Sequence, residues 1–216
     1  MEALILYFVL FFPAFNLPPF AGVLEQAMDP VPFSILRELG RTLTYTIPAL
    51  ALLWYLMSDK KGFSALKKEK PGAGDAYSFS IGFSGLILIS LGISLLIPLF
   101  SEYLELKSPP RVEAPLNAAG WIVLVFSCLG TGYLEESYFR YYLLTKLENP
   151  VPQAALRIIF SVVLFSLCHV YEGPWGVLNA VLAGILLSLV FFRFRSIHGI
   201  AWAHGAYNIF VYAMGN

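Results

Sequence analysis

The stretch YLEESYFRYYLL, residues 133–144, decides the interpretation of this chain because it places two glutamates and an arginine in an otherwise apolar segment. An ionisable side chain at membrane depth is costly, and it usually faces a protein interior or a water-filled cavity. The composition indicates a membrane protein, since 58% of the 216 residues are hydrophobic and only 13% are charged. The sequence therefore predicts an integral membrane protein with a polar functional centre at Glu135, Glu136 and Arg140.

The charge balance and the cysteines argue against several classes of function. Fourteen basic and fourteen acidic residues give a formal net charge of zero, which argues against nucleic-acid binding by the whole chain. Cys128 and Cys168 both lie in apolar runs, so neither a disulfide framework nor a cysteine-rich metal site is available. Residues 1–15 lack the basic leader and cleavage site of a removable signal peptide, so we expect a retained first span.

Seven apolar runs approach the length that a bilayer requires, which is roughly 20 residues. They predict an all-α polytopic transmembrane helical bundle of about seven spans, with six or eight if a boundary is displaced. The fourth run would extend about 45 Å as one straight helix, so we expect a kink or a new helix start at Gly130 and Gly132. The predicted spans cover residues 3–24, 42–57, 79–100, 117–146, 155–171, 175–193 and 198–214.

The distribution of lysine and arginine predicts the orientation of the bundle. With a cytoplasmic N-terminus, nine basic residues fall on the cytoplasmic side and four on the other, while Arg140 is intramembrane. This bias predicts a cytoplasmic N-terminus and a C-terminus outside. The nine are Lys60, Lys61, Lys67, Lys68, Lys70, Lys146, Arg157, Arg193 and Arg195, and the four are Arg37, Arg41, Lys107 and Arg111.

Polar residues on three predicted spans lie near one depth. Glutamates 135 and 136 are the acids well within a span, and two of the three histidines are also placed inside spans. Depths can be counted from the predicted cytoplasmic helix ends. They are about 16 Å for Glu135, about 18 Å for His169, about 9 Å for His204 and about 15 Å for Asn208, at about 1.5 Å per residue.

The spacing of these residues indicates different roles for the two glutamates. Glu136 and Arg140 are four residues apart with the acid first, the favourable order for an ion pair, which leaves Glu135 as the free carboxylate. His204 and Asn208 share one helix face, so the amide could orient the imidazole or hold a substrate carbonyl. Such a set suits general-base activation of water. Each piece alone is also compatible with helix packing.

Three motifs in this order resemble a known family. EESYFR (135–140), FSLCH (165–169) and HGAYN (204–208) resemble the EExxxR, FxxxH and HxxxN motifs of the CAAX protease and bacteriocin-processing family of intramembrane proteases. The resemblance covers about residues 117–214. It implies that this segment is the catalytic helical core, and it leaves residues 1–116 as an N-terminal transmembrane region of unassigned role.

The resemblance implies a hydrolase, an intramembrane endopeptidase that cuts a membrane-associated protein or peptide, near its C-terminus in some relatives. Both a metalloprotease and a metal-free glutamate mechanism are open, because Glu135, His169 and His204 could bind either zinc with an open fourth position or only a water molecule. The implied partners are the substrate and the lipid bilayer, in a prokaryotic plasma membrane. The implied catalytic residues are Glu135, supported by Glu136 and Arg140, together with His169, His204 and Asn208.

Two functions of other classes compete with proteolysis. One is a non-proteolytic membrane scaffold or chaperone with the same fold, and the other is a small proton-coupled transporter. A transporter would more typically show two pseudo-symmetric halves, which the sequence lacks. GAGD (72–75) has the spelling of an aspartyl-protease motif, but it falls in a predicted lysine-rich connector. GFSG (82–85) has a rhomboid spelling, but its serine precedes every histidine, which is the wrong order.

Overall fold

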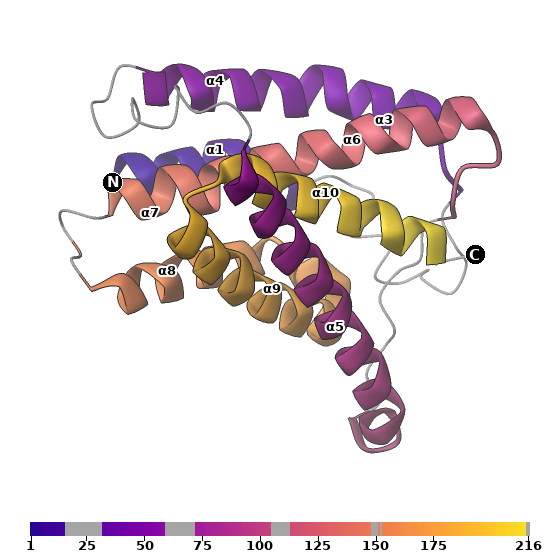
Figure 1. Cartoon of the computed structure of the whole chain (residues 1–216). Coiled ribbons are helices and arrows are strands. Elements are labelled where there is room, and N and C mark those ends of the chain that lie inside the picture. Colours follow the sequence, from indigo (N-terminus) through magenta and orange to yellow (C-terminus); the bar gives the residue numbers. More distant parts are fainter. Residues whose placement is uncertain (16–31, 59–71, 105–112, 148–150, 152, 215–216) are drawn as a thin grey trace.

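The computed structural model of the protein describes residues 1–15, 32–58, 72–104, 113–147, 151 and 153–214 (Figure 1). These residues form helices and connecting turns, with no strand among them. The first part contains α1 (Glu2–Phe15), α3 (Ile35–Arg41), η1 (Thr42–Thr46), α4 (Ile47–Ser58) and α5 (Ala73–Leu104). The second part contains α6 (Ala118–Glu136), η3 (Ser137–Tyr142), α7 (Leu143–Lys146), α8 (Ala154–Leu167), η4 (Val170–Glu172), α9 (Gly173–Phe194) and α10 (Ile197–Met214).

The described helices form seven consecutive segments, which confirms the predicted all-α fold class. Three segments are long and apolar enough to cross a membrane, namely α5, the α6–η3–α7 segment and the η4–α9 segment, while α1 and α8 are shorter apolar helices. Large apolar side chains such as Leu88, Leu95 and Leu99 of α5 are exposed. Such a surface suits lipid tails and would be unfavourable in water. The chain is an integral membrane protein.

Helix α10, which carries His204 and Asn208, lies between α5 and α6. It packs against α5 on one side and against α6 on the other. Figure 1 shows α3, η1 and α4 as one long rod beside α6, and α8 and α9 as a neighbouring pair. The α5 helix crosses α9 and α10, and its C-terminal part extends away from the other helices (Figure 1). This arrangement brings the histidine-bearing α10 directly onto the glutamate-bearing α6.

Two helix boundaries differ from the predicted spans, and both affect polar residues. α5 begins at Ala73, so Asp75 lies in the first helical turn and not in a connector. Its carboxylate accepts the backbone N–H of Gly72 at 2.7 Å, a favourable contact at a helix N-terminus. α8 ends at Leu167, so His169 lies in the turn that follows and not inside the helix. The last turn tightens because backbone N–H groups there bond three residues back.

The predicted break at Gly130 and Gly132 is wrong. α6 continues as a regular helix to Glu136 and passes into the π-helical turn η3, which then leads into α7. A π-helical turn accommodates an extra residue and frequently occurs at functional sites. Here it begins directly after the paired glutamates and contains Arg140, so the irregular backbone is part of the polar centre.

Gly132 and Gly205 have a different role, which is to let α6 and α10 approach closely. A Cβ atom on Gly132 would lie 2.7 Å from the carbonyl oxygen of Ala201. A Cβ atom on Gly205 would lie 3.0 Å from the Cα atom of Leu129. Small residues are a common means of bringing membrane helices together. The two glycines therefore set the distance between the helix that carries the glutamates and the helix that carries His204.

Aromatic residues attach α1 to the π-helical turn. The ring centroids of Phe11 and Phe139 are 4.9 Å apart, and those of Tyr7 and Tyr138 are 6.3 Å apart. The Tyr138 hydroxyl donates a hydrogen bond to the carbonyl oxygen of Ala3 at 2.6 Å. The first helix thus packs directly against residues that follow the paired glutamates. The division of the chain at residue 116 stays a prediction.

Candidate active site

Glu136 is the fixed member of the glutamate pair. Its side chain is fully buried, and its Oε1 atom accepts a hydrogen bond from Arg140 Nη1 at 3.0 Å. The ion pair predicted from the four-residue spacing is therefore present. The same Oε1 atom lies 2.7 Å from Nδ1 of His204, on α10. Glu136 consequently joins two helices, because it binds a cation of its own segment and an imidazole of another.

His204 lies between the two glutamates. Its Nδ1 atom contacts Glu136, and its Nε2 atom lies 3.6 Å from Oε2 of Glu135. In a neutral imidazole, a proton on Nδ1 would be donated to Glu136 and would leave Nε2 as an acceptor. The group that orients His204 is thus Glu136, whereas the sequence had suggested the amide of Asn208. The Nε2 atom of His204, which faces Glu135, remains able to accept a hydrogen bond.

Oε1 of Glu136 is bonded to Arg140 and His204, whereas Oε2 of Glu135 has no hydrogen-bond partner among the described residues. The same holds, within that part of the chain, for Oε2 of Glu136 and for Nε and Nη2 of Arg140. Buried polar atoms are normally hydrogen-bonded to protein or to ordered water. The centre therefore has several buried donors and acceptors that can bind a water molecule or a polar part of a substrate.

His169 reaches this centre from the turn after α8. Its Nδ1 atom is 2.9 Å from the carbonyl oxygen of Phe165, so a proton on Nδ1 would be donated there and Nε2 would be an acceptor. The Phe165 ring lies 4.6 Å from the His169 ring and 6.1 Å from the His204 ring. It also lies 4.2 Å below the Arg140 guanidinium, a cation–π contact. Phe165 is thus in ring contact with both histidines and with the arginine of the site.

Asn208 lies one helical turn beyond His204 on α10 and is half-buried. The structure therefore brings Glu135, Glu136, Arg140 and His204 together by direct contacts, and it connects His169 to them through the Phe165 ring. Asn208 lies on the same face of α10 as His204, as the four-residue spacing predicted, and its catalytic role stays a prediction.

The residues suggested for zinc are Glu135, His169 and His204. Among the described residues, no group of three or more His, Cys, Asp and Glu side chains is close enough to hold a metal ion. In this arrangement Glu135 approaches His204 at 3.6 Å, but the three side chains do not come close enough together to form a ready set of ligands. Zinc binding stays a prediction, and no step below depends on it.

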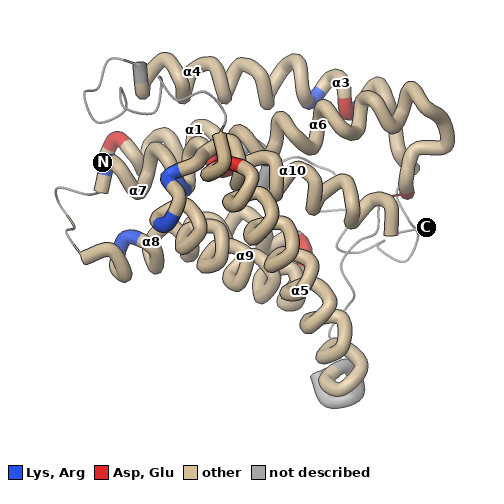
Figure 2. Tube along the Cα trace, in the orientation of Figure 1, with Lys and Arg blue, Asp and Glu red and all other residues tan. Residues whose placement is uncertain are grey.

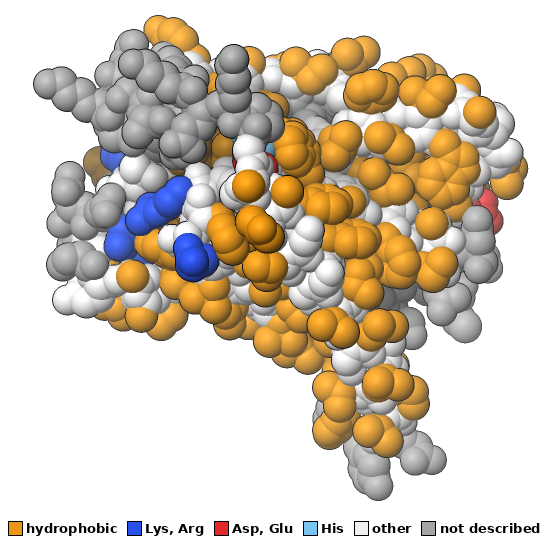
Figure 3. All heavy atoms as spheres, viewed as in Figure 1, with side chains coloured by type: hydrophobic (Ala, Val, Ile, Leu, Met, Phe, Trp, Pro, Cys, Tyr) orange, Lys and Arg blue, Asp and Glu red, His pale blue; other side chains and the backbone are white. Residues whose placement is uncertain are grey.

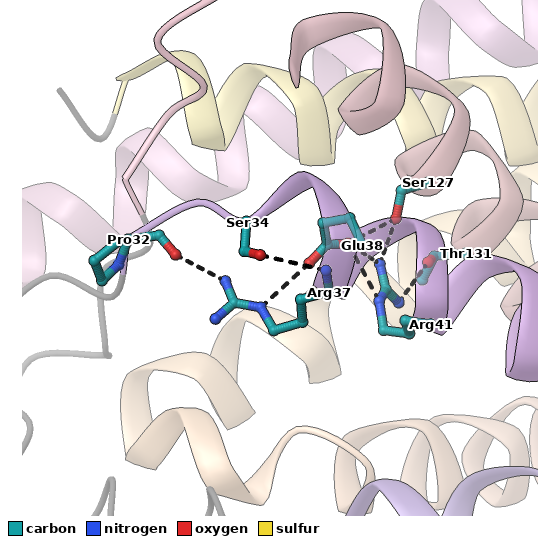
Figure 4. A network of polar contacts seen from close by, with 7 residues as sticks. All are labelled: Pro32, Ser34, Arg37, Glu38, Arg41, Ser127 and Thr131. Carbon is teal, nitrogen blue, oxygen red and sulfur yellow. Dashed lines mark hydrogen bonds and ion pairs between the residues drawn. The ribbon is translucent and has the colours of Figure 1, made fainter. Parts of the chain in front are cut away.

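A second buried polar network was missed from the sequence (Figure 4). Glu38 is buried, and its Oε2 atom accepts hydrogen bonds from Arg41 Nη2 at 2.9 Å and from Ser127 Oγ at 2.8 Å. Arg41 Nη1 donates to Thr131 Oγ1 at 3.1 Å. Because Ser127, Thr131 and Glu135 are four residues apart on α6, the network lies on the helix face of Glu135. The available signal was this polar four-residue spacing within an apolar run.

Comparison with known proteins gives one match. The sequence profile of a family described as type II CAAX prenyl endopeptidase Rce1-like matches residues 117–210. Neither the curated proteins nor the solved structures that were compared gave a match. The matched segment contains all of the predicted site residues. The match confirms the resemblance predicted from the three motifs: residues 117–210 are similar to the Rce1-like family of type II CAAX prenyl endopeptidases.

Proposed function

We propose that the protein is an intramembrane endopeptidase in which Glu135 activates water to hydrolyse a peptide bond of a membrane-associated protein or peptide. The observation that carries the proposal is the position of His204, 2.7 Å from one glutamate and 3.6 Å from the other. Glu136 is held by hydrogen bonds with Arg140 and His204, whereas Oε2 of Glu135 has no hydrogen-bond partner in the described part of the chain and only the longer 3.6 Å contact to His204. A general base needs such an available carboxylate within reach of its proton donor.

The proposed reaction uses one water molecule, bonded to Oε2 of Glu135 and to Nε2 of His204. Glu135 takes a proton from the water while the water oxygen forms a bond to the carbonyl carbon, and the carbonyl oxygen becomes an oxyanion. When this intermediate collapses, the carbon–nitrogen bond breaks and Glu135 gives the proton to the leaving amine. The products are a new carboxylate and a new amine, and no group remains attached to the protein.

The remaining residues hold or polarise the reacting groups in this proposal. Glu136 keeps the proton of His204 on Nδ1, and Arg140 holds Glu136 in place through the 3.0 Å contact. The amide of Asn208 donates to the oxyanion, since donors aimed at a developing charge are a major source of catalysis. His169 lines the site beside Phe165 and contacts the substrate backbone.

The substrate class follows from the setting. Helices that are apolar on their outer surface admit substrates from the bilayer, so we propose a peptide that is tethered to the membrane near its C-terminus. The name of the matching family refers to prenylated CAAX proteins. Peptides with a lipid-modified cysteine near the C-terminus are therefore the first class to test.

The experiment compares the C-termini of membrane proteins, by mass spectrometry, in cells that express the wild type, Glu135→Gln or Glu113→Gln at matched levels. Glu113 is an exposed carboxylate outside the site and serves as the matched control. We expect certain termini to be shortened by the wild type and by the control variant but not by Glu135→Gln. Identical termini in all three cell lines, with each protein present and folded, would contradict the proposal and favour a scaffold or a carrier.

A further inference from the structure

Three arginines gather at one end of the α8–α9 pair. Arg157 lies in the first turns of α8, Arg193 lies in the last turn of α9, and Arg195 follows that helix. The Phe192 ring lies between two of them, 5.4 Å from the Arg157 guanidinium and 5.2 Å from that of Arg195. Figure 2 shows Lys and Arg positions near one another along the Cα trace here, and Figure 3 shows Lys and Arg side chains grouped on this face of the molecule. Charges of the same sign are thus concentrated where α8 begins and α9 ends.

Two of these cations are exposed and have no acidic partner in the described structure. Arg193 and Arg195 are both exposed, and neither forms an ion pair with a described residue. Their guanidinium groups rest on aromatic rings, since Arg193 lies 5.2 Å from the ring of Phe194. Guanidinium groups are the preferred partners of phosphate because they present several donors in one plane. This end of the molecule is therefore complementary to an anionic phosphate group.

The backbone at Arg195 supports a function for its side chain. Arg195 has a φ of 55°, and among the described residues it is the one non-glycine residue with a positive φ. Its N–H bonds the carbonyl oxygen of Phe191 at 2.8 Å, so it ends α9 at a position where glycine is strongly preferred. A left-handed conformation is unfavourable for a residue with a side chain, because its Cβ atom comes too close to the following carbonyl oxygen. The chain keeps an arginine at a site where glycine would be less strained.

An apolar groove of about 420 Å³ is lined by α8 and α9, and its lining on α9 extends from Val177 to Ile185, about two helical turns before Arg193. Ile158, which follows Arg157 directly, lines its beginning, and Val170 lines its other end. The polar lining residue is Ser166, whose hydroxyl is already bonded to the carbonyl oxygen of Val162 at 2.8 Å. Ile159 is among the lining residues that are exposed on the outer surface. The groove thus opens toward lipid and offers only apolar contacts.

We propose that this end of the α8–α9 pair binds an anionic phospholipid. The phosphate group lies against Arg193 and Arg195, and one acyl chain occupies the groove between α8 and α9. Charge complementarity favours an anionic headgroup. A zwitterionic headgroup carries a positive charge, which the arginines would repel. The cytoplasmic leaflet is the anionic one, and the positive-inside rule assigns this basic end to it. This inference does not depend on proteolysis.

The experiment measures lipid selectivity by native mass spectrometry of the purified full chain. Phosphatidylglycerol and phosphatidylcholine with identical acyl chains are titrated separately, and the ratio of their dissociation constants is taken for each variant. Arg193→Gln combined with Arg195→Gly removes both charges, and glycine suits the backbone conformation at 195. From the usual contribution of each surface arginine near an anionic lipid, we expect the selectivity ratio to fall by roughly 30-fold.

Two control variants separate a local site from general electrostatics. Arg193→Lys with Arg195→Lys keeps both charges and should keep most of the selectivity. Arg37→Gln removes a positive charge from a different helix, α3, and should leave the ratio unchanged. An unchanged ratio in the Gln/Gly variant, or an equal fall in Arg37→Gln, would overturn the proposal.

Two further measurements, one with a groove variant and one with a competing anion, distinguish a bound lipid from a bound ion. Ile159→Trp should fill the groove and weaken phosphatidylglycerol binding, while glycerol phosphate at the same concentration should not compete with the lipid. If glycerol phosphate displaces the lipid as effectively as a second phospholipid does, the site binds a free anion and the lipid proposal is wrong. If Ile159→Trp binds the lipid with wild-type affinity, the acyl chain does not occupy the groove.

Discussion

The Nδ1 atom of His204 lies 2.7 Å from Oε1 of Glu136, and this contact joins α10 to α6 in the buried centre of the protein. The same oxygen also binds Arg140. The second oxygen of this carboxylate has no partner among the described residues. One glutamate of the pair is thus committed to holding other side chains, which leaves its neighbour available for chemistry.

Glu136→Gln should destabilise the protein strongly. The substitution leaves the fully buried Arg140 without its counter-charge, and breaking a buried ion pair in this way costs about 3–5 kcal/mol. Thermal unfolding in detergent measures the loss. Combining Glu136→Gln with Arg140→Met removes both charges and should recover part of the stability. A double variant less stable than the single one would show that the pair does not act as a unit.

Gly132→Ala should lower both stability and peptide cleavage. Its Cβ atom would lie 2.7 Å from a backbone oxygen of α10, so the helices must separate at a cost of about 1–3 kcal/mol. The matched control is Gly92→Ala on α5, where an added Cβ meets nothing within 4 Å. The control should be neutral or slightly stabilising, since alanine favours helices. Equal effects of the two substitutions would contradict the close-approach role of Gly132.

The Glu38 network should contribute modestly to stability. Glu38→Gln weakens the contacts to Arg41 and Ser127, and we expect a loss of about 1 kcal/mol because the Arg41 side chain is partly exposed and can be solvated. Arg37→Gln, which removes a longer 3.9 Å contact to the same carboxylate, should change the melting temperature little. Thermal unfolding checks both variants. A larger effect at Arg37 would show that the network has been assigned to the wrong arginine.

We expect the N-terminus in the cytoplasm and the C-terminus outside. Glu2 binds Lys146 at 2.8 Å, so the N-terminus lies at the end of the α6–α7 segment that carries this cytoplasmically assigned lysine. Protease accessibility of terminal tags in intact cells tests the orientation, and a protected C-terminal tag would contradict it. Of the basic residues that were counted to predict the orientation, seven lie outside the described residues, namely Lys60, Lys61, Lys67, Lys68, Lys70, Lys107 and Arg111.

The sequence predicted the helical class and much of the polar centre for simple physical reasons. Helical spacing was sufficient for the Glu136–Arg140 pair, and the similar depths predicted for Glu135, His169 and Asn208 indicated one polar centre shared by three spans. Contacts between helices could not be predicted in the same way. The partner of His204 depends on how closely α6 approaches α10, which is decided at Gly132.

Three local predictions were wrong or incomplete because they depend on the exact backbone path or on contacts between helices. The glycines of α6 indicated a kink, but both are accommodated in a regular helix, and the irregular backbone is the π-helical turn after Glu136. Hydropathy placed His169 within a span because the turn after α8 is nearly as apolar as the helix. The predicted second span begins at residue 42 and leaves Glu38 outside it, because the burial of Glu38 depends on partners on α6 about ninety residues away along the chain.

The most direct test of the central proposal is the cleavage rate of a lipid-tethered peptide, identified from the shortened C-termini, by the purified protein in a bilayer. Wild type, Glu135→Gln and Glu113→Gln are compared once thermal unfolding has shown that the three proteins have similar melting temperatures. Because a general base contributes about 10²–10⁴-fold, we predict a loss of at least 100-fold for Glu135→Gln and none for the control. A Glu135→Gln protein that cleaves the peptide at the wild-type rate would contradict the account.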